Sequence, residues 1–167
     1  ARGILRARRE LLDGAAVEVG RMPATITLGL IPTIAPYRVG PVLKAMKQMH
    51  PGTTLRIVED ITQNLVQATA RGELDAAIIA TDTNDSLIAE TELGHDELLL
   101  AVDRNHPLAS QAQVKPKQLQ DETMLLLKDG HCLSDQAMSF CSANSVGAAP
   151  VSIAASIDTL KSMICAG

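Results

Sequence analysis

The sequence between residues 24 and 80 alternates between two kinds of apolar spacing. Residues 25–31 place apolar side chains at every second position, which is the spacing of a strand. The next apolar residues recur mostly three positions apart, as on one face of a helix: Val39, Val42, Leu43, Met46 and Met49. A strand at 54–59, a helix at 62–72 and an apolar run at 74–80 follow. This succession predicts an α/β unit in which right-handed crossover helices join parallel strands.

Proline and glycine mark where these elements are expected to end. Pro32 and Pro36 bracket a turn after the first strand, and Pro51 ends the first helix. Gly72 is expected to cap the second helix. The run at 74–80 does not alternate, which predicts a strand that is buried on both faces.

A polar stretch at 81–86 separates this unit from a second set of elements. Their expected order is a strand at 97–102, a loop at 103–109, a short helix at 115–121, a strand at 124–128, a helix from Asp135 and a last helix at 156–165 with Ser156 as its N-cap. Residues 1–16 have helical spacing and suit a connector or dimerisation helix. The predicted domains are a linker helix at 1–20, a lobe at 21–94 and a lobe at 95–167. No strand follows the last helix, so both lobes are expected to be partial.

The charge pattern argues against nucleic-acid binding by this chain itself. Its net charge is −4, whereas such surfaces need clustered Lys and Arg. The one basic cluster comprises Arg2, Arg6, Arg8 and Arg9. A solvated helix face is the first interpretation of this cluster, and phosphate binding is the alternative.

Compartment and cofactors follow from what the chain contains. It has no apolar stretch of about 18 residues and opens with no signal peptide, which predicts a cytoplasmic protein with no membrane contact. Thiols are kept reduced there, so its three cysteines are either core residues or redox-active ones. His50, His95, His106 and His131 lack metal-ligand spacing, and His50 and His106 are expected to be exposed. No metal, cofactor or enzymatic motif is expected.

Cys132 lies between a buried strand and the start of a helix. Ser134 and Asp135 are good N-cap residues for that helix. The positive end of the helix dipole, together with a protonated His131, favours the thiolate form that attacks peroxide.

Cys141 follows nine positions later. On a helix, nine steps of 100° place the two sulfurs on opposite faces, with a rise of about 13 Å. A disulfide needs Cα atoms within about 7 Å, so the pair can close only if the helix unwinds. Such a conflict suits a redox switch, in which a sulfenic acid on Cys132 condenses with Cys141. Packing in an aliphatic core is the alternative for both residues, and it is the interpretation adopted for Cys165.

The segment GHCLSDQAMSFC at 130–141 resembles the redox segment of OxyR-type peroxide sensors in the LysR family of transcription regulators. Residues 28–52, 59–65, 71–80 and RNHPLA at 104–109 are also similar to LysR-type effector domains. The resemblance implies two α/β lobes of the periplasmic-binding-protein type, hinged near 81–95.

The same resemblance assigns roles to individual residues. It implies that Cys132 is the peroxide-reactive thiol and Cys141 its resolving partner. The peroxide-pocket positions fall on Thr33, Thr62 and His131, with Asp135 in support. From the residues alone, Thr33 is a turn residue and Thr62 the N-cap of helix 62–72, and both interpretations are compatible with a pocket. We expect the reduced arrangement, with the two thiols apart.

The resemblance also implies partners. The intact protein would be a homo-oligomer, a dimer or tetramer, that senses hydrogen peroxide in the bacterial cytoplasm. It would bind promoter DNA and RNA polymerase through parts outside this chain, activate antioxidant genes, and be reduced by a cytosolic thiol reductant such as glutaredoxin. Ser134 departs from the family pattern, which commonly has Arg there, and Cys165 occupies a site that usually lacks a thiol.

Two other functions compete with the sensor. One is a LysR-type effector domain that binds a small organic inducer between its lobes, for which two cysteines bracketing a helix are unnecessary. The other is a thiol peroxidase that turns over many equivalents of peroxide. The leading prediction is a regulatory domain that is not an enzyme.

Overall fold

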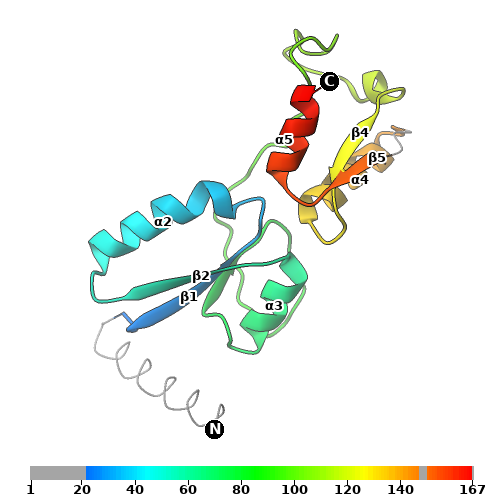
Figure 1. Ribbon diagram of the computed structural model, residues 1–167. Helices are drawn as coiled ribbons and strands as arrows, with labels where there is room; N and C mark the ends of the chain where they lie inside the picture. The colour runs from blue at the N-terminus through cyan, green and yellow to red at the C-terminus, as the bar shows by residue number, and fades with distance from the viewer. Residues whose placement is uncertain (1–21, 147–149, 167) are drawn as a thin grey trace. The chain divides into compact units, whose positions relative to one another are not determined.

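The computed structural model describes residues 22–146 and 150–166 and divides into two compact units. The first unit ends at Ile79 and the second starts at Ala80 (Figure 1). The predicted linker helix lies outside the described residues. The predicted lobe boundary between residues 94 and 95 stays a prediction.

The first unit is built on a parallel sheet with the order β2-β1-β3. Its strands are β1 (Thr25–Leu30), β2 (Thr54–Glu59) and β3 (Ala76–Ile78). Leu30 of the central strand is opposite Glu59 on one side and Ile78 on the other. Because β1 has neighbours on both sides, Leu30 and the adjoining Ile31 are almost completely buried. The predicted α/β unit is confirmed.

Helices α2 (Ala35–Met49) and α3 (Thr62–Ala70) lie on opposite faces of this sheet (Figure 1). Pro36 does not close a turn ahead of α2, as predicted, but lies inside its first turn. Proline is accepted there because the first N–H groups of a helix have no intrahelical partner. Helix α3 ends two residues earlier than predicted, and Gly72 follows it in the left-handed conformation, with φ 64°.

Strand β3 is shorter and more exposed than predicted. The run at 74–80 yields only three strand residues, and Ala76 is exposed. Within the described residues β3 pairs only with β1, so its other edge has no ladder. Burial on both faces was therefore the wrong prediction for this strand, and it applies to β1 instead.

Gly29 of β1 lies where the sheet and α3 approach closely. A Cβ atom at this position would come within 2.8 Å of both Leu65 Cδ2 and Leu74 Cδ1. Leu65 and Leu74 are buried at 1% and 6% exposure, so neither methyl group has room to move away. The absence of a side chain at Gly29 therefore permits this packing.

Gly29→Val is expected to lower the free energy of unfolding of the first unit by roughly 1–3 kcal/mol, the usual effect of overpacking a core. Urea denaturation followed by circular dichroism measures the change. Gly40→Ala is the matched control, because a Cβ there meets no atom within 4 Å. Equal stability of the two variants would contradict the close packing at Gly29.

The second unit contains two parallel strands, β4 (Met124–Leu127) and β5 (Pro150–Ala154). Helix α4 (Cys132–Ala143) connects them, and α5 (Ile157–Ala166) follows β5 (Figure 1). The short helix expected at 115–121 is a 3-10 helix, η1 (Pro116–Leu119). Ser156 caps α5 as predicted, since its Oγ accepts the N–H of Thr159 at 3.2 Å. Strand β5 was not predicted.

The strand expected at 97–102 is absent from the described structure of this segment. These residues have no strand partner, and their side chains Leu98, Leu99 and Leu100 are 49%, 79% and 40% exposed. The apolar run therefore has strand composition without the ladder that would make it a strand.

Candidate functional site

Cys132 is the first residue of α4, and His131 is the N-cap. The backbone of His131 is extended, with φ −88° and ψ 118°, and its carbonyl accepts the N–H of Ser134 at 2.9 Å. The helix therefore starts before Asp135, where the sequence predicted it. Ser134 and Asp135 are not caps but belong to the first turn. Cys132 consequently lies among the N–H groups at the positive end of the helix.

The two polar residues of this first turn differ in burial. Ser134 is a small residue that is only 7% exposed. It stands where the family that the segment resembles commonly has Arg. Asp135 is exposed. A carboxylate in the first turn interacts favourably with the helix dipole, which supports the start of α4 in the absence of a side-chain cap.

Cys141 is sealed inside an apolar cluster. It is 4% exposed and clusters with the buried residues Leu108, Leu119 and Val146. Val114 and Met124 pack against the same cluster. The Cys141 thiol is therefore almost completely buried among apolar side chains.

A Schellman motif ends α4 two residues after Cys141 and uses the Cys141 carbonyl as an acceptor. The N–H of Val146 donates to the Cys141 carbonyl at 2.9 Å, and the N–H of Ser145 donates to Ser142 at 3.2 Å. Ser145 occupies the left-handed position of this motif, with φ 55°, where Gly is usual. The side chain of Val146 then returns to the Cys141 cluster, as the hydrophobic contact of such a motif does.

The two thiols are free, buried and held by one continuous helix. Nine helical steps separate their Cα atoms by about 13 Å along the axis, whereas a disulfide needs about 7 Å or less. The expected reduced arrangement is confirmed. A bond between the two sulfurs requires α4 to unwind.

Thr33 and Thr62 follow the carboxyl ends of the neighbouring strands β1 and β2. Leu30 and Glu59 end these strands in register, and the N–H of Asp60 donates to the Leu30 carbonyl at 3.3 Å. The first unit thus brings Thr33 and Thr62 to one edge of its sheet. Thr62 is not the N-cap of α3, as predicted, because Ile61 has that position and Thr62 is the first helical residue.

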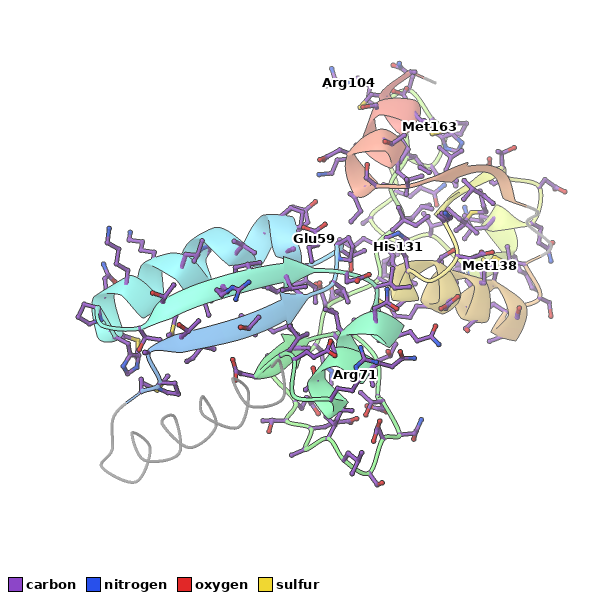
Figure 2. The ribbon with its side chains drawn as sticks, turned by 60° about the horizontal axis from the view of Figure 1, so that its bottom comes forward. Glu59, Arg71, Arg104, His131, Met138 and Met163 are labelled. Atoms are coloured by element: carbon purple, nitrogen blue, oxygen red, sulfur yellow. The ribbon has the colours of Figure 1, made fainter. Side chains whose placement is uncertain are left out.

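Two buried side-chain polar atoms lack a hydrogen-bond partner within the described part of the chain. They are Thr62 Oγ1, in the first unit, and His131 Nδ1, in the second. Figure 2 shows His131 at the start of α4, with Met138 farther along the same helix. An unsatisfied buried polar atom costs roughly 1–3 kcal/mol, which favours a small polar molecule as its partner.

His106 and Cys165 differ from their predicted environments. The side chain of His106 is 29% exposed, since its Nε2 contacts Glu122 Oε2 at 3.3 Å. Cys165 is exposed rather than packed in the core, because the more buried residues of α5 are Ile157, Leu160, Met163 and Ile164. Apart from the apolar Leu108 in RNHPLA, no sequence pattern indicates the side chains that cover Cys141.

Metal-ligand clusters and membrane-spanning helices are both absent from the parts of the chain that the structure describes. There, His, Cys, Asp and Glu side chains do not gather in groups of three or more that could hold a metal ion. None of the described helices has the length and apolar character needed to cross a membrane.

The profile of one protein family, described as the LysR substrate binding domain, matches residues 20–167. The DNA-binding transcriptional dual regulator OxyR of Escherichia coli is 33% identical over 167 residues, covering 100% of this chain and 55% of that protein. The chain spans about half the length of the curated relatives it matches.

Solved structures agree with the sequence match. A crystal structure of the reduced form of OxyR has a TM-score of 0.75 and 34% identity, covering 86% of this chain and 66% of that one. A cysteine-to-serine mutant of Corynebacterium glutamicum OxyR with hydrogen peroxide bound has a TM-score of 0.78 and 28% identity, covering 99% and 53%. The predicted resemblance and α/β fold class are thereby confirmed.

Proposed function

The chain belongs to the family of LysR substrate-binding domains, and on this premise we propose that it is the peroxide-sensing part of a LysR-type transcription regulator. Its switch is a disulfide between Cys132 and Cys141. The relatives that bear the names OxyR and hydrogen peroxide-inducible genes activator support this choice over an organic inducer.

One observation carries the proposal. The resemblance assigned three residues to a peroxide pocket, and two of them, Thr62 and His131, own the buried polar atoms that lack a partner in the described residues. Peroxide has two oxygens that both donate and accept hydrogen bonds, so hydroxyl and imidazole groups suit it. We assign Thr33, Thr62 and His131 to peroxide binding, with Asp135 supporting the start of α4.

The chemistry takes two balanced steps. The Cys132 thiolate attacks one peroxide oxygen, the O–O bond breaks, and the leaving hydroxide takes up a proton to become water. Cys132 is then a sulfenic acid. The Cys141 thiol attacks the Cys132 sulfur, the S–O bond breaks, and a second water leaves as the disulfide forms.

The intact protein extends this proposal to partners. We propose a homo-oligomer in the bacterial cytoplasm that binds promoter DNA and contacts RNA polymerase to activate antioxidant genes. A thiol reductant of the glutaredoxin type would return the disulfide to two thiols. This reduction resets the sensor, which therefore acts as a regulator rather than as an enzyme.

Thiol counting and intact-mass measurement test the proposal in the full-length protein with Cys165→Ala, which removes the exposed thiol. One equivalent of hydrogen peroxide is expected to remove two thiols and about 2 Da. If both thiols survive a modest excess of peroxide, the sensor proposal fails. Turnover of many equivalents with a thiol reductant would indicate a peroxidase instead.

Thr62→Val is expected to slow the oxidation of Cys132 while leaving the protein at least as stable. The substitution keeps the side-chain shape and removes a buried hydroxyl that has no described partner. Loss of one hydrogen bond to peroxide slows the reaction roughly three- to tenfold. Stopped-flow oxidation and urea denaturation provide the two measurements.

Thr69→Val in the same helix is the control for Thr62→Val. The Thr69 hydroxyl donates to the Leu65 carbonyl at 2.8 Å, so it is already satisfied within α3. Its loss is expected to leave the oxidation rate unchanged. Equal oxidation rates for Thr62→Val and the unaltered protein would remove Thr62 from the peroxide site.

A further inference from the structure

The loop at 103–109 forms one wall of the Cys141 cluster. Leu108 of this loop is 8% exposed and packs in the cluster that covers Cys141. The loop is folded on itself by local hydrogen bonds, from the N–H of His106 to Asp103 and from the N–H of Ala109 to His106. The position of Leu108 therefore depends on how this turn is held.

His106 ties Leu108 to the segment that precedes β4. Its Nδ1 accepts the N–H of Leu108 at 3.2 Å, and its Nε2 lies 3.3 Å from Glu122 Oε2. The ring therefore contacts the Leu108 backbone through one nitrogen and the Glu122 carboxylate through the other. The N–H of Glu122 donates to the carbonyl of Leu119, a second member of the cluster. The His106 ring thus links the loop that carries Leu108 to the segment that carries Leu119 and Glu122.

We infer that His106 and Glu122 form a clasp that controls the release of Cys141 for disulfide formation. The inference rests on the proposed function, in which Cys141 is the resolving thiol. His106 does not touch the reacting sulfurs in this role. It is a positioning residue that acts through Leu108.

The clasp separates the two chemical steps. Oxidation of Cys132 by peroxide takes place at the first residue of α4 and does not require Cys141 to move. Attack of Cys141 on the Cys132 sulfenic acid requires Cys141 to leave its cluster and the helix to open. Loosening the clasp therefore speeds the second step and leaves the first unchanged.

A substitution at the C-terminal end of α4 is expected to have the opposite effect on the second step. Ser145 holds the left-handed position of the Schellman motif, where a Cβ atom is unfavourable. Ser145→Gly stabilises this helix end, which keeps Val146 against Cys141. This substitution is expected to slow the second step.

The experiment compares variants of the full-length protein with Cys165→Ala. Peroxide is added together with a diketone that traps sulfenic acids, and mass spectrometry gives the ratio of trapped Cys132 to disulfide. The consumption of peroxide gives the rate of the first step. We expect His106→Ala and Glu122→Ala each to raise the second-step rate roughly two- to fivefold, with an unchanged first step. Ser145→Gly is expected to lower the second-step rate by a similar factor.

Three comparisons separate a clasp from general destabilisation. Glu122→Gln retains a carbonyl acceptor and is expected to stay near the original rate. The double variant of His106→Ala and Glu122→Ala is expected to be no faster than either single variant, because both remove the same link. His95→Ala is the matched control, since the His95–Glu92 pair has the same chemistry at 3.1 Å but side chains that are 90% and 72% exposed.

The outcomes distinguish a failure of the clasp from a failure of the sensor proposal on which it rests. If the disulfide forms at one rate in the unaltered protein, in His106→Ala and in Ser145→Gly, the clasp is refuted and the sensor proposal stands. If no disulfide forms in the unaltered protein, the sensor proposal itself fails. A change in the first step equal to that in the second would assign His106 to general stability instead of to Cys141.

Discussion

Replacing Cys132 by Ser is expected to abolish the loss of thiols in response to one equivalent of hydrogen peroxide. Cys132 is the first residue of α4 and the thiol to which the proposal assigns the attack on peroxide. Cys141 packs among aliphatic side chains and has the resolving role in the proposal, so we do not expect it to substitute as the first nucleophile. The expected result with Cys165→Ala is an unchanged intact mass and one remaining, unreacted thiol.

Cys141→Ser provides the complementary result. Here the first step proceeds and the second has no resolving thiol, so the product gains about 16 Da as a sulfenic acid. The two serine variants thus stop the reaction at different stages. If Cys132→Ser and Cys141→Ser gave the same product, the assignment of attacking and resolving thiols would be wrong.

Oxidation is also expected to remove most of the hydrogen-exchange protection of α4. The bond between Cys132 and Cys141 brings together Cα atoms that the helix holds about 13 Å apart. Amides in the second half of α4 are therefore expected to exchange at rates near those of an unstructured chain. Exchange followed by mass spectrometry of peptides compares the reduced and the oxidised protein.

Helix α3 serves as the internal reference for this measurement. It contains no cysteine, so its amides are expected to keep their protection in both states. Ser156 caps α5 independently of α4, and α5 offers a second reference within the same unit. A disulfide that forms while α4 stays protected would mean that the sulfurs pair between two chains.

The parts of the fold that were predicted correctly depend on local spacing. Strands β1, β2 and β4 and helices α2, α3 and α5 each carry their own apolar period or cap, so a short window of sequence suffices. Ser156 is a clear case, because its hydroxyl bonds an N–H only three residues away. These interactions do not depend on where the rest of the chain lies.

The errors concern features that depend on partners distant in sequence. Residues 97–102 have the composition of a strand but no ladder in the described structure, and β3 is exposed because of its edge position. Strand β5 was missed because Pro150 and Ser152 interrupt its apolar pattern, although Val151 and Ile153 supply a β-branched signal. Pairing with β4 makes this segment a strand.

The roles of the two thiols stay a prediction, and the structure adds the packing around them, which was not predicted. The segment at 130–141 identified both thiols, while a strong N-cap preference for Ser134 and Asp135 placed the helix start too late. The carbonyl of His131 begins the helix without any side-chain cap. The seal over Cys141 is assembled from residues as far apart as Leu108 and Val146, so no local pattern could reveal it.

The helical preference of α4 limits how strongly the proposed switch can hold its oxidised state. In the proposed switch, oxidation would break a helix that the reduced protein favours, and that preference would persist as long as the disulfide held the segment open. Once a reductant breaks the disulfide, α4 re-forms, and the free energy spent in unwinding the helix is recovered. In this proposal, a more stable α4 biases the protein more strongly toward its reduced state. Ser145 occupies a left-handed position that suits Gly, so α4 is less stable than it would be with Gly at this position.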